Sequence, residues 1–207
     1  MIAIIDVNYG NQRSVLNAFT AIGADVRLTR DHADLRNARA LVLPGVGAFA
    51  DGMAALDRYD LIDLLRREVM DAGKPFLGIC VGLQLLATIG LEHGETPGLG
   101  WIPGSVLPLD VGKQPLRVPH VGWNDVRFLR TDGLYAGMGE KAAFYFVHSY
   151  ALRPEHPTVI SGVTNYGEDF TASLESGNIA ATQFHPEKSH HTGLKLLENW
   201  RKRALSC

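Results

Sequence analysis

Two short segments, far apart in the chain, carry residue types that together could perform covalent acyl transfer. Residues 78–82 place Cys80 between two glycines, directly after an apolar run. Residues 185–187 supply His185 and Glu187 on either side of a proline. This chemistry requires a nucleophile, a base and a group that orients the base. The thiol, the imidazole and the carboxylate therefore form a candidate catalytic set.

The surroundings of Cys80 are those of a nucleophile elbow, a sharp strand-to-helix turn that exposes one reactive side chain. Glycine on both sides leaves room for a tight backbone turn and for a closely bound substrate. A helix that begins at Val81 would point the Val81 N–H at a developing oxyanion, and the glycine-rich loop 44–47 is the candidate source of a second donor. The alternative for a cysteine taken alone is an inert small hydrophobe.

His185 is one of eight histidines, so its selection needs an argument. A residue before proline is held extended, and side chains two positions apart on an extended segment share one side. His185 and Glu187 can therefore face one cleft, with the carboxylate fixing the imidazole tautomer. A surface turn after a strand is the alternative. A metal site that adds His190 and His191 is a further option, but no acidic or thiolate cluster supports it, and we predict no metal ion.

Further polar residues could line the same cleft. Gln84 follows Cys80 by four residues and would share its helix face, and Glu92 lies near the end of that segment. Residues 146–150 end a predicted strand, and open α/β sheets place ligands at strand tips. Each residue alone is better explained by a structural role. The candidates at this tip are His148, Ser149 and Tyr150.

The elements that must position these residues alternate between strand and helix in the first half. The expected strands there are residues 2–7, 24–29, 40–43 and 76–79. Helical spacing is found over residues 15–22, 59–72 and, near the end of the chain, 192–203. The second half reads as short strands at residues 105–109, 116–118, 124–128, 143–147, 159–163, 171–174 and 179–184, with a hairpin at 175–178.

This order predicts an α/β fold with an open, mostly parallel sheet flanked by helices, and additional short antiparallel strands in the second half. No linker or repeat is visible, so we expect a single domain over residues 1–207. A hydrophobic content of 46% and a net charge of −2 indicate a globular protein without a basic footprint for nucleic acid. Two cysteines, one of them the last residue, Cys207, and the lack of a membrane-length apolar run favour a reducing, cytoplasmic compartment.

Several strings in order resemble the class I, triad-type glutamine amidotransferases with the flavodoxin-like fold, and most closely the glutaminase subunits of imidazole glycerol phosphate synthase. The matching strings are residues 4–11, 43–49, 78–84, 119–124, 146–150 and 183–189. The cysteine elbow and His-Pro-Glu identify the superfamily. Pro-His-Val-Gly-Trp-Asn, Phe-Val-His-Ser-Tyr and Glu-Lys-Ser select the histidine-biosynthesis branch.

The resemblance implies a role for each matching residue. Cys80 would be the nucleophile, His185 the general base and then acid, and Glu187 its orienting group. The oxyanion donors would come from Val81, Val46 and Gly47. Glutamine would be held by Gly47, Gln84, Glu92, His148, Ser149 and Tyr150. The interface with a synthase partner would include Asn8, Asn11, Val121, Trp123 and Lys188.

The implied activity is hydrolysis of L-glutamine to glutamate and ammonia through a Cys80 thioester, with no cofactor. Ammonia would pass through a tunnel to a (β/α)₈ cyclase partner, in a heterodimer that forms imidazole glycerol phosphate and aminoimidazole carboxamide ribotide. The sequence has no Walker loop, dinucleotide fingerprint or cation-binding loop of its own. The alternatives are an amidotransferase subunit of another pathway, a cysteine hydrolase that acts alone, and a flavodoxin-like module without activity.

Overall fold

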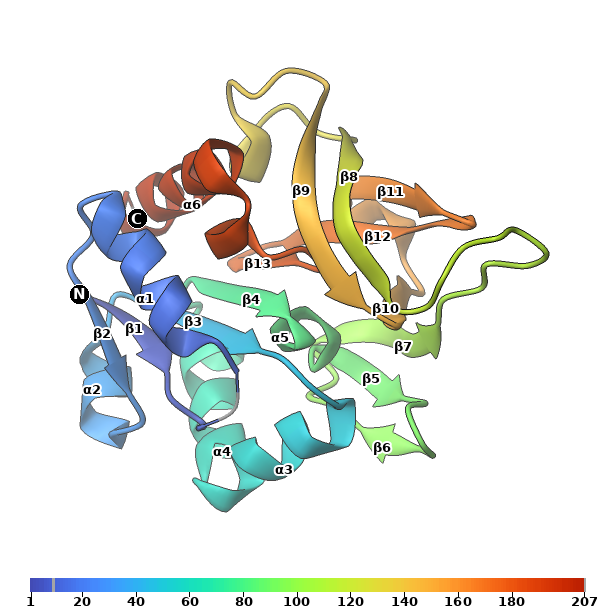
Figure 1. Ribbon diagram of the computed structural model, residues 1–207. Coiled ribbons are helices and arrows are strands. Elements are labelled where there is room, and N and C mark those ends of the chain that lie inside the picture. The colour runs from blue at the N-terminus through green and yellow to red at the C-terminus, as the bar shows by residue number, and fades with distance from the viewer. Residues whose placement is uncertain (9, 207) are drawn as a thin grey trace.

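The computed structural model describes residues 1–8 and 10–206, and Cys207 therefore lies outside the described residues. Within them, nine strands form one mixed sheet in the order β2-β1-β3-β4-β13-β12-β11-β8-β9 (Figure 1). Its parallel half comprises β2 (Val26–Thr29), β1 (Ile2–Ile5), β3 (Ala40–Gly45), β4 (Phe76–Cys80) and β13 (Ile179–Thr182). Its antiparallel half comprises β12 (Glu168–Ser176), β11 (Ile160–Tyr166), β8 (His120–Phe128) and β9 (Lys141–His148).

Every residue of β1, β3, β4 and β13 is buried, because helices cover both faces of the parallel half. Figure 1 shows α1 (Gln12–Ala21) and α6 (His190–Leu205) on one face, with α3 (Phe49–Arg58) and α4 (Leu61–Leu65) on the other. A short α2 (His32–Asn37) follows β2. None of the described helices is long and apolar enough to cross a membrane.

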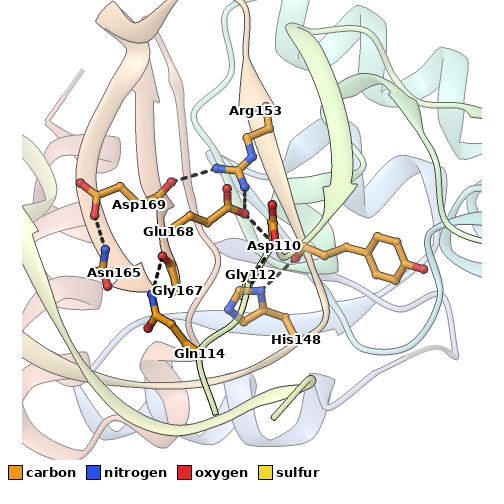
Figure 2. Close-up of polar contacts among 10 residues, drawn as sticks. Asp110, Gly112, Gln114, His148, Arg153, Asn165, Gly167, Glu168 and Asp169 are labelled. Carbon is orange, nitrogen blue, oxygen red and sulfur yellow. Dashed lines mark hydrogen bonds and ion pairs between the residues drawn. The ribbon is translucent and has the colours of Figure 1, made fainter. Parts of the chain in front are cut away.

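A second sheet lies beside the antiparallel half, in the order β10-β7-β5-β6. Its strands are β10 (Tyr150–Pro154), β7 (Ile102–Pro108), β5 (Ala87–Gly90) and β6 (Thr96–Pro97). The loop after β7 is tied to the β11–β12 turn, because the Asp110 N–H donates to Glu168 Oε1 at 2.8 Å and Gln114 donates to the Gly167 carbonyl at 3.1 Å (Figure 2). Arg153 on β10 completes this group through its ion pair with Glu168.

The predicted fold class is confirmed, and one predicted element is wrong. The helix expected over residues 59–72 is present over residues 61–71: it begins after Asp60, which takes a left-handed conformation (φ 54°) between α3 and α4, and residues 66–71 continue α4 as a π-helix. Residues 116–118 are loop, not strand. They lie between Pro115 and Pro119, which have no N–H for a strand ladder.

The topology gathers the candidate residues at one rim of the main sheet. Cys80 is the last residue of β4, and His148 is the last residue of β9. Gly45, the last residue of β3, is paired in register with Cys80. His185 follows β13, the strand beside β4, after two further residues. The carboxyl ends of the parallel strands thus meet where open α/β sheets bind their ligands.

Candidate active site

Cys80 occupies the strained elbow that the flanking glycines predict. Its φ of 56° and ψ of −109° are rare for a residue with a side chain, and α5 (Val81–Gln84) begins directly after it. Close packing excludes side chains at both flanks. A Cβ on Gly78 would lie 2.6 Å from the Gly82 carbonyl oxygen, and a Cβ on Gly82 would lie 1.9 Å from that of Leu43.

This strain gives a stability prediction. Because glycine adopts positive φ freely, the free energy of unfolding should be about 1 kcal/mol higher for Cys80→Gly than for Cys80→Ala. Both variants lack the sulfur, so their difference isolates the backbone. Urea unfolding of the two variants measures it. Equal stability, or a more stable alanine variant, would mean that the elbow stores no strain at this position.

His185 and Glu187 form a buried pair. The His185 Nδ1 lies 2.6 Å from Glu187 Oε1, and both side chains are 0% exposed. The same oxygen accepts a hydrogen bond from the amide of Asn11, the residue directly before α1. The His185 Nε2 has no oxygen or nitrogen partner among the described residues and is left for the sulfur. Burial lowers the pKa of His185, but the charge and hydrogen bond of Cys80, together with Glu187, outweigh it and raise this pKa to about 10.

The sulfur has a second polar neighbour. The Gln183 side chain donates from Nε2 towards the Cys80 Sγ at 3.7 Å, and its Oε1 accepts from Gln84 at 3.1 Å. Gln183 is fully buried. The sequence patterns predicted no role for Gln183, although its position two residues before His185 on an extended segment placed it on the same side.

Cys80 opens into a pocket of about 400 Å³, a volume that suits a small ligand. All six residues predicted to hold glutamine line it, as do the predicted oxyanion residues. The lining residues are Val46, Gly47, Ala48, Cys80, Val81, Gln84, Glu92, Pro119, Val147, His148, Ser149 and Tyr150. Pro119 belongs to the loop that Glu168 and Gly167 hold, so this loop supplies one edge of the pocket.

Several of these residues use their polar atoms in hydrogen bonds within the pocket wall itself. Gln84 donates to the Tyr150 carbonyl at 2.9 Å. Glu92 accepts from the Phe49 N–H at 2.7 Å and so caps α3. Both ring nitrogens of His148 are engaged inside the protein, with the Tyr150 carbonyl at 2.9 Å and with His120 at 3.1 Å. His148 therefore lines the pocket without a ring nitrogen free for a ligand.

The two buried histidines give a pH prediction. Burial lowers the pKa of His120 to about 4 and that of His148 to about 3, whereas both should titrate near 6.5 when unfolded. Below pH 6.5 the unfolded chain therefore binds protons that the folded chain does not, and stability falls as pH falls. Each histidine contributes a slope of up to about 1.4 kcal/mol per pH unit. The raised pKa of His185 acts in a separate window, since its contribution is full below pH 6.5 and is lost only towards pH 10.

Urea unfolding between pH 6.5 and 5, above the range of most carboxylates, measures this effect. His120→Asn is the matched control, because it removes one of the two titrating rings and should make the slope shallower. A wild-type stability that stays constant across this interval would show that the histidines titrate normally.

The predicted oxyanion residues come together at the ends of β3 and β4. A Cβ on Gly45 would lie 2.9 Å from the Val81 Cβ, so only glycine allows this approach. Gly47 has a φ of 110°, so glycine flanks Val46 on both sides. A Cβ on Gly10 would lie 3.3 Å from the Val46 nitrogen. The loop after β1 thus packs directly on the peptide that is expected to supply the second donor.

The predicted interface residues divide into separate groups. Val121 (56% exposed) and Trp123 (48%) point outward from β8, and the exposed Lys188 lies over the Tyr145 ring at 5.8 Å. Trp123 stacks on His190 at 5.2 Å, a contact that no sequence pattern predicted. We refer to Val121, Trp123, Tyr145, Lys188 and His190 as the β8 face.

Asn8 and Asn11 lie apart from the β8 face. Asn8 is exposed and forms hydrogen bonds with Tyr59 and Arg30. Asn11 is half-buried and donates a hydrogen bond to Glu187. Of the residues described, no three or more histidines, cysteines or acidic residues are grouped as a metal ion would require.

Comparisons with known proteins agree with this geometry. The family model "Glutamine amidotransferase class-I" matches residues 3–203. "Imidazole glycerol phosphate synthase subunit HisH" of Aquifex aeolicus (strain VF5) is 46% identical over 202 residues, which cover 97% of this chain and 96% of that protein. The protein of the same name from Moorella thermoacetica is 46% identical over 199 residues, covering 96% of this chain and 93% of its own.

Solved structures share the fold at low sequence identity. A structure titled "Crystal structure of glutamine amidotransferase" superposes with a TM-score of 0.75 at 19% identity and covers 99% of both chains. A glutamine amidotransferase from Thermotoga maritima gives a TM-score of 0.61 at 16% identity, covering 98% of this chain and 82% of its own. Together with the family match and the HisH relatives, the elbow, the buried His-Glu pair and the pocket lead to one conclusion: the chain belongs to the class I glutamine amidotransferases, in the HisH family of imidazole glycerol phosphate synthase subunits.

Proposed function

We propose that this protein is the glutaminase subunit of imidazole glycerol phosphate synthase and hydrolyses L-glutamine through a thioester on Cys80. The observation that carries the proposal is the sulfur itself. It lies on a strained elbow at a pocket of about 400 Å³, against a histidine whose other nitrogen is bonded to a buried carboxylate. Nucleophile, base and orienting group thus have the relation that acyl transfer requires.

The reaction would begin with attack of the thiolate on the side-chain amide carbon of glutamine. The N–H groups of Val81 and of the loop at Val46 and Gly47 would hold the oxyanion. His185 would give its Nε2 proton to the leaving nitrogen, so that ammonia departs and a γ-glutamyl thioester remains. His185 would then take a proton from water, which attacks the thioester and releases glutamate and the thiolate. Glu187 keeps the Nδ1 proton in place throughout.

The pocket residues support this assignment by their position. Gln84, Glu92, Gly47, Ser149 and Tyr150 surround the opening to Cys80, where the amino-acid end of glutamine must lie while its amide reaches the sulfur. We further propose that residues 1–207 act as one domain and that the protein works in the cytoplasm, where free thiols persist.

We propose a (β/α)₈ cyclase as the partner, in a heterodimer. Ammonia released into bulk water is protonated and loses its nucleophilicity, so an enclosed path to an acceptor is required. The relatives' name describes a subunit of a synthase, which implies a further component. The β8 face has the chemistry of a docking surface, since it places the exposed Val121 and Trp123 beside a lysine. On the partner, ammonia would join the ribotide to give imidazole glycerol phosphate and aminoimidazole carboxamide ribotide.

Affinity capture of the tagged chain from its native cell tests this function. We expect a (β/α)₈ cyclase to co-elute, and the eluate to form glutamate from glutamine when the ribotide is added. Val121→Asp, which places a charge on the β8 face, should reduce co-elution without unfolding the chain. A chain that elutes alone and hydrolyses glutamine or other amides at full rate would instead be a free-standing cysteine hydrolase.

A further inference from the structure

Two buried histidines on adjacent strands form a chain of hydrogen bonds that the proposed mechanism does not use. His120 on β8 is directly opposite His148 on β9. They are only 3% and 6% exposed, and their rings meet at 3.1 Å between His120 Nδ1 and His148 Nε2. His148 borders the glutamine pocket, whereas His120 lies one residue from Val121 of the β8 face.

The partners at each end fix where the protons are. The Tyr150 carbonyl oxygen can only accept, so His148 Nδ1, at 2.9 Å, carries a hydrogen. In a neutral ring Nε2 then has the lone pair, and it accepts from His120 Nδ1. The His120 Nε2 has the next lone pair, which faces the Asn124 amide nitrogen at 3.4 Å. All donors therefore point in one direction, from Asn124 to Tyr150.

An added proton would disrupt this chain of hydrogen bonds. Protonation of His148 would set two N–H groups against each other unless His120 changed tautomer. That change would turn a His120 N–H towards the Asn124 amide, itself a donor to the Asn165 carbonyl at 3.0 Å. The His120 ring cannot rotate freely, since it stacks on Tyr166 at 4.0 Å and on Phe146 at 4.9 Å. Geometry thus selects one neutral tautomer for each ring.

The acceptor at the end of the chain belongs to the pocket wall. The Tyr150 carbonyl also accepts from Gln84 at 2.9 Å. Two side chains, Gln84 on α5 and His148 on β9, therefore hold one peptide group. The preceding carbonyl, of Ser149, accepts from the Leu109 N–H at 2.9 Å. These hydrogen bonds to the Ser149 and Tyr150 carbonyls hold the segment that contains Ser149, and Ser149 lines the pocket together with Cys80.

We propose that His148 and His120 are positioning residues for glutamine: their hydrogen-bond chain fixes the Ser149–Tyr150 backbone as a wall of the pocket and joins that wall to β8. His148 then acts through the backbone that it holds, and its ring makes no hydrogen bond to the substrate. This inference rests on the proposed function, because it assigns the pocket to glutamine.

The tautomers can be measured on the unaltered protein. Nitrogen-15 NMR of the ring nitrogens at neutral pH should show both His120 and His148 as neutral rings protonated at Nδ1, the less common tautomer of free histidine. Assignment uses His120→Asn and His148→Asn, each of which removes one set of signals. A ring protonated at Nε2, or exchange between tautomers, would overturn the proposal without use of any activity assay.

A pair of variants in the complex with the cyclase tests the functional part. Asparagine can place its amide nitrogen near the site of the histidine Nδ1, so His120→Asn keeps the donor to His148, whereas His120→Leu removes it. We expect His120→Leu to raise the KM for glutamine about tenfold, the effect of one lost buried hydrogen bond, with a smaller change in kcat. His120→Asn should stay within about twofold of wild type.

The outcomes separate the two proposals. If the wild-type complex does not hydrolyse glutamine, the proposed function fails. If it does, and the leucine and asparagine variants have equal KM values, the positioning role fails. The ring nitrogens of His148 in His120→Leu provide a readout that a general loss of packing would not give. The Nδ1 proton should stay in place, because the Tyr150 carbonyl still accepts it, whereas the nitrogen-15 resonance of Nε2 should shift because Nε2 loses its donor. An unchanged Nε2 resonance would contradict the proposal.

Discussion

Glutamine-dependent synthesis by the complex should fall by about four to six orders of magnitude when Cys80 is replaced by alanine, while synthesis supplied with ammonium salt continues at the wild-type rate. The loss is this large because Cys80 forms the covalent bond, and no neighbouring group can replace its sulfur. Ammonia, by contrast, enters after the thioester step. Separate assays of the complex with glutamine and with ammonium salt at high pH provide the comparison.

Cys80→Ser is the matched control for this prediction. It keeps a hydroxyl at the elbow but is a much weaker nucleophile, so it should resemble the alanine variant with glutamine and the wild type with ammonium. Loss of both activities in the alanine variant would assign Cys80 a structural role. Retention of glutamine-dependent activity in the alanine variant would place the nucleophile elsewhere.

Glutamine hydrolysis by the isolated chain should be slow, and addition of the cyclase with its ribotide ligand should raise it by about 10²–10³-fold. A single oxyanion donor contributes an effect of this size. The candidate donor is the peptide at Val46, which glycine flanks on both sides and which can therefore rotate at little steric cost. Gly10 packs on this peptide, and it belongs to the loop that carries Asn8 and Asn11. Contact of a partner with that loop can therefore reach the oxyanion site.

Steady-state rates with and without the cyclase and ligand measure this activation. Val121→Asp should reduce it by weakening docking, and excess cyclase should restore it, because the active site of that variant is unchanged. A chain that hydrolyses glutamine equally fast alone would show that both oxyanion donors are already in place.

The parallel half of the fold could be predicted because its strands are buried on both faces and read as continuous apolar runs. The expected strands at residues 40–43 and 76–79 end within one or two residues of β3 and β4. The elements of the second half were harder to predict from the sequence. Residues 116–118 have the composition of a strand, but they are loop, because the flanking prolines lack an N–H and the Arg117 carbonyl accepts from the Tyr166 hydroxyl. The helix predicted over residues 59–72 begins two residues later than expected, because Asp60 adopts a left-handed backbone conformation that no residue pattern there signals.

The candidate site divides in the same way. Cys80 and its glycines form a local pattern, and so do His185 and Glu187. The contacts that complete the site join distant residues: Asn11 reaches Glu187 across 176 positions, and Gln183 reaches Cys80 across 103. The His120–His148 bond exists only because β8 and β9 pair in that register. The alternation of residues assigns each side chain to a face of its strand, but the long connection between Phe128 and Lys141 does not reveal at which offset the two strands pair.

The most direct test of the central claim is peptide mapping by mass spectrometry after treatment of the complex with a glutamine analogue that carries an electrophile at the position of the amide. We predict one adduct, on the peptide that contains Cys80, formed in step with the loss of glutamine-dependent activity and prevented by excess L-glutamine. An adduct on another residue with activity lost, or full inactivation with Cys80 unmodified, would contradict the account.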